Sequence, residues 1–159
     1  MTGPESLEGI PFLSNLTDDE RAQVAALATR KQVPAGTTLL TEGEADDALH
    51  VLVKGLVSFR ILQEGGGEDS CMGTTNEPGY LFGMSAVLGD EHKSPYGAVC
   101  LEDCELLEFD GAQFRQLCED ECRVGAHVLR QLIVTIAQRL HAARAQIRSR
   151  VRPGLISHG

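Results

Sequence analysis

Apolar residues in the middle of the chain occur in short runs separated by glycine-containing turns, a pattern typical of antiparallel strands. The tight turn Lys54-Gly55 joins two such runs, and a glycine-rich acidic segment at 64–69 predicts an exposed loop. Short strands at this regular spacing indicate a sandwich or a barrel. We predict one apolar strand within 33–44, followed by strands at 48–53, 56–62, 70–75, 97–101 and 105–109.

Helical patterns occur only toward the two ends of the chain. Residues 7–13 predict a short helix or turn. Thr17 and Glu20 have the spacing of a capping box, and the helix that they begin is predicted to end near Arg30-Lys31. Asp110 predicts the N-cap of another helix. The expected fold class is therefore mainly β with flanking helices, a jelly-roll-like β-roll.

Residues 121–150 predict one long helix whose apolar positions alternate in steps of four and three. A single β-roll cannot cover a helix of this length, so we expect the apolar stripe to pair with a second copy. Gly125 is unfavourable inside a helix, so the regular helix is expected to start after it. Two domains are predicted, a β-roll at 1–120 and the C-terminal helix at 121–152. The predicted dimer seam comprises Leu129, Ile133, Ile136, Leu140 and Ile147, with Ala143 as a weaker position.

The stretch 78–98 carries the most informative local chemistry. It begins with a Pro-Gly turn and continues through the apolar run 80–82 and Gly83 into a segment, 84–88, that can form one helical turn. A short helix that is entered from a strand through glycine directs free backbone N–H groups toward the space in front of it. Proteins commonly hold anions in this way. The stretch therefore predicts a turn suited to cradling an anion.

Composition limits the class of protein. The chain has 159 residues, and 42% of them are hydrophobic, which is sufficient for one core. No apolar run approaches the ~20 residues that are needed to span a bilayer. The N-terminal residues are neither basic nor apolar enough for a signal peptide. We therefore expect a cytoplasmic protein without a membrane partner.

The formal charge of –9 is unevenly distributed. Residues 1–121 hold all 23 acidic and 7 of the 14 basic side chains, whereas residues 122–159 hold the other 7 basic side chains and no acidic one. A basic end can contact nucleic acid or an acidic partner. The basic side chains can also complement the negative C-terminal end of a helix dipole, and we favour this interpretation.

Candidate metal and catalytic groups are sparse. The five cysteines are an odd number, and Cys100/Cys104 and Cys118/Cys122 lack partner ligands at matching spacing. Reduced, partly buried thiols are expected rather than a metal site. No nucleophile–base pair or metalloprotease-type motif is present, and the β region offers only His50 and His92. We expect neither catalytic residues nor metal ligands.

Helix, glycine-punctuated β-roll, anion-cradling stretch and long terminal helix follow one another in a recognisable order. This order resembles the sensor domain of the catabolite-activator and fumarate-nitrate-regulator superfamily, and cyclic-nucleotide-binding domains generally. The resemblance implies that 78–98 is a phosphate-binding cassette and that the long helix mediates dimerisation. The matching residues are Pro11-Phe12-Leu13, Leu16, Ala35-Gly36, Glu42-Gly43-Glu44, Gly55, Pro78-Gly79, Phe82-Gly83 and Gln138-Arg139-Leu140.

The cassette departs from the family pattern at its two polar ligands. Members that bind cyclic nucleotide use a Glu for the ribose and an Arg for the cyclic phosphate, and this chain has Met84 and Ser94 there. A thioether and a hydroxyl cannot replace those charges. No cofactor is predicted, and a cyclic nucleotide is disfavoured as the ligand. By resemblance, the ligand-binding residues are Phe82, Gly83, Met84, Ser85, Ala86, Lys93, Ser94, Tyr96 and Arg144.

These observations predict a non-catalytic, dimeric sensor or regulatory module with a small-molecule effector. One alternative is a structural domain that binds an unknown protein partner and has an empty pocket. Another is a haem or redox sensor that uses a cysteine or one of His50, His127 and His141. Few residues follow the long helix, so no sequence-specific DNA binding is expected. The first cysteine, Cys71, lies inside the roll, which argues against the family's iron–sulfur branch.

Overall fold

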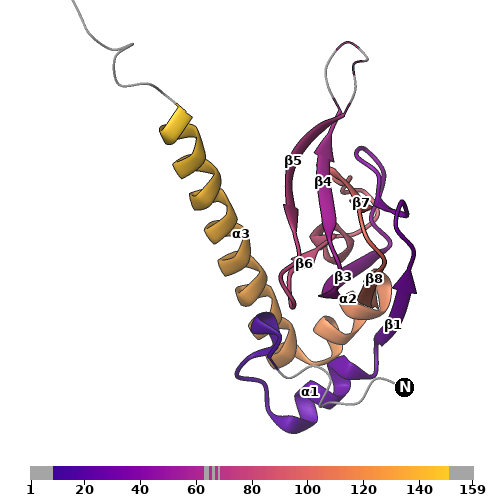
Figure 1. Cartoon of the computed structure of the whole chain (residues 1–159). Coiled ribbons are helices and arrows are strands. Elements are labelled where there is room, and N and C mark those ends of the chain that lie inside the picture. Colours follow the sequence, from indigo (N-terminus) through magenta and orange to yellow (C-terminus); the bar gives the residue numbers. More distant parts are fainter. Residues whose placement is uncertain (1–8, 63–64, 66, 68, 151–159) are drawn as a thin grey trace, which may run out of the picture.

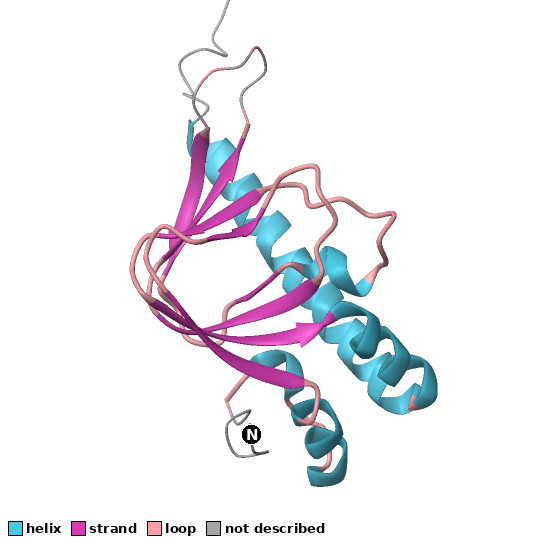
Figure 2. Ribbon diagram, turned by 90° about the vertical axis from the view of Figure 1, so that its right-hand side faces the viewer, coloured by secondary structure: helices cyan, strands magenta, loops and turns pink. Residues whose placement is uncertain are grey.

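The computed structural model describes residues 9–62, 65, 67 and 69–150. It contains two four-stranded antiparallel sheets that face each other (Figure 2), with strand orders β1-β8-β3-β6 and β2-β7-β4-β5. The mainly-β fold with flanking helices is thereby confirmed. The strands are β1 (Ala28–Val33), β2 (Thr38–Leu40), β3 (Ala48–Lys54), β4 (Val57–Ile61), β5 (Ser70–Thr75), β6 (Leu81–Phe82), β7 (Gly97–Cys100) and β8 (Cys104–Asp110).

Side-chain alternation along the strands divides the core into two layers. On β8, Leu106 points between the two sheets and packs in the same cluster as Phe59 and Phe82. Leu107 and Phe109 point to the opposite face of the sheet, where they pack with residues from the helices. The sheet that contains β8 is therefore covered on both faces.

Among the described residues, four helical elements surround the roll and a fifth lies within the cassette. Those around the roll are the 3₁₀ turn η2 (Pro11–Leu13) and the helices α1 (Asp18–Ala25), α2 (Gly111–Asp120) and α3 (Cys122–Arg150). The cassette holds the single 3₁₀ turn η3 (Met84–Val87). Residues 7, 8, 151 and 152, which belong to the predicted elements, lie outside the described residues. No helix in the described part of the chain is long and apolar enough to cross a bilayer.

The first helix is shorter than the sequence predicts. The capping box is present, because the Thr17 N–H donates to Glu20 Oε1 at 2.9 Å and the Glu20 N–H donates to Thr17 Oγ1 at 3.3 Å. However, α1 ends at Ala25, and Ala28–Val33 forms β1 beside β8. The prediction that the helix reaches Arg30-Lys31 is wrong, because residues 28–33 all pair with β8 and form the edge strand of this sheet.

Gly125 lies inside α3 rather than before it, which corrects our prediction that the helix begins after this residue. Its amide donates to Glu121 O at 2.9 Å, so the helical bonding is regular there. A Cβ at this position would lie 2.4 Å from the Cys118 carbonyl oxygen on α2. Glycine therefore permits α2 and α3 to approach backbone to backbone, and this packing outweighs its poor helix propensity.

We expect Gly125→Ala to destabilise the fold, because the added methyl group collides with the α2 backbone. Overpacking of this kind costs roughly 1–3 kcal/mol, which corresponds to a fall of about 2–12 °C in Tm for a chain of this size. Gly73→Ala is the matched control, since a Cβ there meets nothing within 4 Å. Thermal unfolding followed by circular dichroism measures both. An unchanged Tm for Gly125→Ala would contradict the packing role.

The fully buried side chains of the long helix all lie in its N-terminal half. Its buried residues are Val124, Gly125, Val128 and Leu132, and Figure 1 shows the C-terminal half running away from the roll. Along this helix a stripe of large apolar side chains stays substantially exposed. The exposed fractions are 42% for Leu129, 66% for Ile133, 49% for Ile136, 55% for Leu140 and 63% for Ile147.

Candidate functional site

A cavity of about 600 Å³ lies between the cassette and α3. This volume falls within the range of small-molecule sites. One wall comes from η3 and the loop that follows it, and the other comes from α3. The lining residues are Asp46, Met84, Ser85, Val87, Leu88, Pro95, Tyr96, Leu129, Leu132, Ile133, Ile136, Arg139 and Leu140.

The cassette turn is held tightly from behind. Gly83, at the start of η3, has φ +76°, and a Cβ there would lie 2.7 Å from Ala48 O. Only glycine combines this backbone conformation with such a close approach. At the other end of the turn, Arg115 of α2 donates to Ala86 O. The first wall of the cavity is therefore a fixed surface built on β3 and α2.

Ser94 belongs to this backing and is only 2% exposed. Its hydroxyl donates to Tyr96 O at 2.7 Å, and its N–H donates to Glu44 O at 2.7 Å. Asp46, which lines the cavity, lies beside Ser94 and is 7% exposed. Burial raises the pKa of the Asp46 carboxyl, the nearby Ser94 hydroxyl opposes this shift, and the neighbouring charge of Asp47 adds to it.

Tyr96 places its hydroxyl in front of the cassette turn. The tyrosine ring packs edge-on against Phe59, with 5.4 Å between ring centroids. Burial raises the pKa of Tyr96, whereas the nearby Arg139 charge and a hydrogen bond from the backbone of Gly83 lower it. The N–H at the start of the turn, one of the groups that could bind an anion, therefore lies near the tyrosine hydroxyl.

Arg139 connects α3 to the cassette strand. Its guanidinium lies 4.1 Å from the centroid of the Tyr80 ring, a cation–π contact, and it donates to Leu81 O. Arg139 matches the family pattern, but neither Arg139 nor Asp46 was among the residues predicted to bind the ligand. An arginine directly beside Leu140 in an apolar stripe was the available signal for Arg139.

The structure divides the nine predicted ligand-binding residues into three groups. Met84, Ser85 and Tyr96 line the cavity. Lys93 and Arg144 are exposed and do not line it, because the Lys93 backbone bridges to Ala45 at the surface and Arg144 lies on the C-terminal half of α3. The remaining four form the packed backing of the cassette: Phe82, Gly83, Ala86 and Ser94.

The sequence profile of the cyclic nucleotide-binding domain family matches residues 30–121, more than half of the chain. The chain belongs to this family. As a cyclic nucleotide-binding domain, it has the family's cassette backbone but presents Met84 and Ser85 at the cavity in place of an acidic ligand. The position where the family's arginine is expected holds the buried Ser94.

Individual relatives agree with this assignment. The chain is 34% identical over 84 residues to a cAMP-dependent protein kinase regulatory subunit from Yarrowia lipolytica, covering 53% of this chain and 21% of the relative. The catabolite activator protein of Thermus thermophilus superposes with a TM-score of 0.70 at 27% identity, over 87% of this chain and 62% of that chain. A putative cyclic nucleotide-binding protein from Geobacter metallireducens superposes with a TM-score of 0.75 at 24% identity, over 89% of this chain and 100% of that chain.

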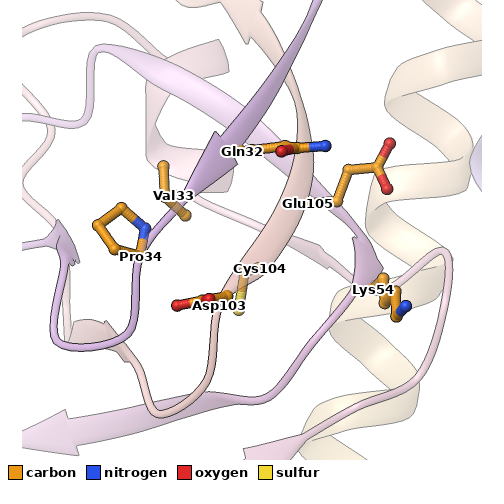
Figure 3. Close-up of a pocket in the computed structure, with 7 residues that line it drawn as sticks. All are labelled: Gln32, Val33, Pro34, Lys54, Asp103, Cys104 and Glu105. Atoms are coloured by element: carbon orange, nitrogen blue, oxygen red, sulfur yellow. The ribbon is translucent and has the colours of Figure 1, made fainter.

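A second cavity, of about 490 Å³, lies between the ends of β1 and β3 and the start of β8 (Figure 3). It is open, and its acidic groups already have partners within the chain. Glu105 pairs with Arg30 at 2.6 Å, and Asp103 accepts from the Ala35 N–H at 2.9 Å. None of the cassette residues lines this cavity, so it is not the candidate site. Its lining residues are Gln32, Val33, Pro34, Lys54, Asp103, Cys104 and Glu105.

Histidines and cysteines do not converge anywhere in the described residues, where no group of three or more His, Cys, Asp or Glu side chains could hold a metal ion. His50 stacks on Phe82 with 5.0 Å between ring centroids, and burial lowers its pKa. All five cysteines are free thiols. Burial and a hydrogen bond with Cys104 raise the pKa of Cys100 to about 12, so this thiol is protonated at neutral pH.

We expect Asp46→Asn to raise the Tm at neutral pH. The folded-state pKa of Asp46 is raised, so its stabilising contribution is present below the unfolded-state pKa and is lost as pH rises through the folded-state pKa. Asparagine removes the charge that burial disfavours and keeps nearly the same side-chain size and shape. Asp47→Asn, at an exposed neighbour, is the control. Thermal unfolding at pH 4 and pH 7.5 should show a larger Asp46→Asn gain at the higher pH; a loss at pH 7.5 would contradict this account.

Proposed function

We propose that this cyclic nucleotide-binding domain is a non-catalytic regulatory module whose effector binds between the cassette and α3. One observation carries the proposal. Four residues of the exposed apolar stripe also line the cavity: Leu129, Ile133, Ile136 and Leu140. Ligand binding and helix pairing therefore involve the same face of α3.

Pairing of α3 with a second copy would cover this stripe. The steps between its apolar residues have heptad spacing, which suits the seam of a two-helix coiled coil. Ile147 extends the stripe into the C-terminal half of the helix, where the side chains are exposed. We therefore propose a homodimer through α3. The four seam residues that line the cavity would each divide their surface between the cavity and the partner helix.

Coupling between effector and dimer follows from this shared face. A ligand shifts an equilibrium only by its difference in affinity for the two states. A molecule that fills the cavity contacts Ile133 and Ile136 directly and changes the shape that these side chains present to the partner helix. The signal would thus be a change in the strength or register of α3 pairing.

The effector is not expected to be a cyclic nucleotide. A buried phosphate needs opposite charge and hydrogen-bond donors. The described cavity has one cationic side chain, Arg139, and it is held by Tyr80 and Leu81 O. The Gly83 N–H lies near the Tyr96 hydroxyl, and Asp46 adds a carboxyl to the same cavity.

The alternatives differ in what they require of the cavity. A structural interaction domain would keep the cavity empty. A ligand-binding experiment therefore distinguishes this alternative from the sensor that we propose. A haem sensor would usually need an axial histidine or cysteine. Neither residue type is among the described residues that line the cavity, which weakens this alternative.

Titration with the neutral fluorophore N-phenyl-1-naphthylamine tests the proposal. We expect saturable binding of about one molecule per chain and, in sedimentation velocity at tens of micromolar protein, at least a threefold change in the dimer dissociation constant. Met84→Asn should weaken fluorophore binding at least fivefold, because Met84 lines the cavity and is not in the seam.

Met72→Asn is the matched control, since Met72 lies on β5, is 55% exposed and is not among the lining residues. It should leave binding unchanged. If the fluorophore does not bind saturably, or binds without altering dimerisation, the sensor proposal fails. The structural interaction domain is then the better reading.

A further inference from the structure

The cavity contains a buried carboxylate without a cationic partner. Asp46 is 7% exposed and lines the cavity. Its neighbours are the hydroxyl of Ser94 and the carboxylate of Asp47, which repels it. Among the described residues, no lysine, arginine or histidine forms an ion pair with Asp46. Burying such a group is unfavourable unless an opposite charge accompanies it.

The single described cation of the cavity is already engaged. Arg139 enters from α3, lies on the face of Tyr80 and donates to Leu81 O. These contacts attach the guanidinium to the cassette strand and leave Asp46 without a salt bridge. The two charged side chains thus differ in what they can offer a ligand, because Arg139 is bonded within the chain and Asp46 lacks a counter-charge.

Around Asp46 the remaining walls are largely apolar. They are formed by thioether, aliphatic and proline side chains, with the Ser85 hydroxyl and the Tyr96 ring as the other polar contributors. A ligand that complements this surface has an apolar body and one positively charged group. The aliphatic lining residues are Met84, Val87, Leu88, Pro95, Leu129, Leu132, Ile133, Ile136 and Leu140.

We propose that the effector is an amphipathic amine, whose ammonium group pairs with Asp46 and whose apolar body fills the space between the cassette and α3. This inference rests on the proposed function and specifies the ligand class of that site. The electrostatics of this site are the reverse of those of a phosphate-binding cassette. The buried Ser94 stands where the family has a cationic arginine, and the nearby Asp46 supplies an anion. Ammonium bound to a desolvated carboxylate forms a strong, charge-assisted hydrogen bond.

Three probes with the same phenylbutyl body test the charge preference: 4-phenylbutylamine, 4-phenylbutan-1-ol and 4-phenylbutanoate. Isothermal titration calorimetry at pH 7.5 should give a dissociation constant for the amine at least tenfold below that for the alcohol. The carboxylate should bind more weakly than the alcohol. In Asp46→Asn, the amine and the alcohol should agree within about twofold.

Asp47→Asn is the matched control, because it removes the same charge one residue away at an exposed position that does not line the cavity. It should retain the tenfold preference. Equal binding of amine and alcohol by the wild type, or an amine preference that survives Asp46→Asn, would overturn the inference. Preference for 4-phenylbutanoate would also overturn the inference and would indicate that Arg139 determines the charge selectivity. The wild-type series decides the question even if Asp46→Asn does not fold.

Failure of this inference is distinguishable from failure of the proposed function. If N-phenyl-1-naphthylamine binds and alters dimerisation while the amine has no advantage, the sensor stands and the ligand class is wrong. If the fluorophore and all three phenylbutyl probes fail to bind, both proposals fall.

Discussion

We expect the Leu140→Asp variant to sediment as a monomer at tens of micromolar, where the wild-type protein forms dimers. Leu140 is 55% exposed in the single chain, so pairing of α3 would bury about half of its side chain in each copy. Losing this burial costs about 1 kcal/mol per copy, and a carboxylate in the seam adds a desolvation penalty. A total of roughly 3 kcal/mol weakens the dimer about 100-fold.

Ala145→Asp is the matched control for this substitution. Ala145 is exposed on the same helix, and the helical repeat places it on the side opposite the seam. It introduces the same charge and should leave the dimer intact. Sedimentation velocity over a concentration series measures both variants. A wild-type protein that is monomeric at tens of micromolar, or a dimer that tolerates Leu140→Asp, would rule out α3 as the interface.

Affinity for cAMP and cGMP is expected to be no better than high micromolar. Each lost hydrogen bond to a charged group costs ~1.5–3 kcal/mol, and losing two reduces affinity by a factor of a few hundred or more. The family's charged pair is replaced by Met84 and Ser94, and the carboxylate of Asp46 would additionally repel the phosphate.

Restoring the family ligands should require more than the two obvious substitutions. In Met84→Glu/Ser94→Arg, the new arginine would be introduced beside Asp46, because Ser94 is close enough to influence the pKa of this carboxyl. The aspartate would pair with the guanidinium and compete with the phosphate. We expect the double variant to gain less than threefold, and its combination with Asp46→Asn to gain at least tenfold. Calorimetric titration with both nucleotides distinguishes these outcomes, and low-micromolar binding by the wild type would contradict the account.

Several local features could be predicted because the residue that indicates each feature lies within a few positions of the backbone that it affects. The Thr17–Glu20 capping box forms as its spacing indicates. Asp110 caps α2 by accepting from the Gln113 N–H at 2.9 Å. Gly83 adopts the left-handed conformation that the cassette turn needs. The two caps are satisfied by a neighbour in sequence, and the turn conformation is one that glycine adopts without steric cost.

Long-range contacts account for what could not be predicted. The first helix was predicted to reach Arg30-Lys31, but pairing with β8 makes residues 28–33 a strand. Gly125 has low helix propensity, yet it is retained inside α3 because α2 approaches it. In both cases tertiary contacts supply more free energy than the local preference, which amounts to about 1 kcal/mol or less per residue.

The candidate site likewise combines local features that could be predicted with long-range contacts that could not. Its cassette backbone, its missing charged ligands and the apolar stripe on the long helix were evident from residue type and spacing, since each depends on a contiguous stretch of chain. The proximity of Asp46 to Ser94, the position of the Tyr96 hydroxyl beside Gly83 and the attachment of Arg139 to Leu81 were decided only by the tertiary structure. These pairs come from separate turns, strands and helices, and whether a buried polar group has a partner depends on which segments the fold brings together.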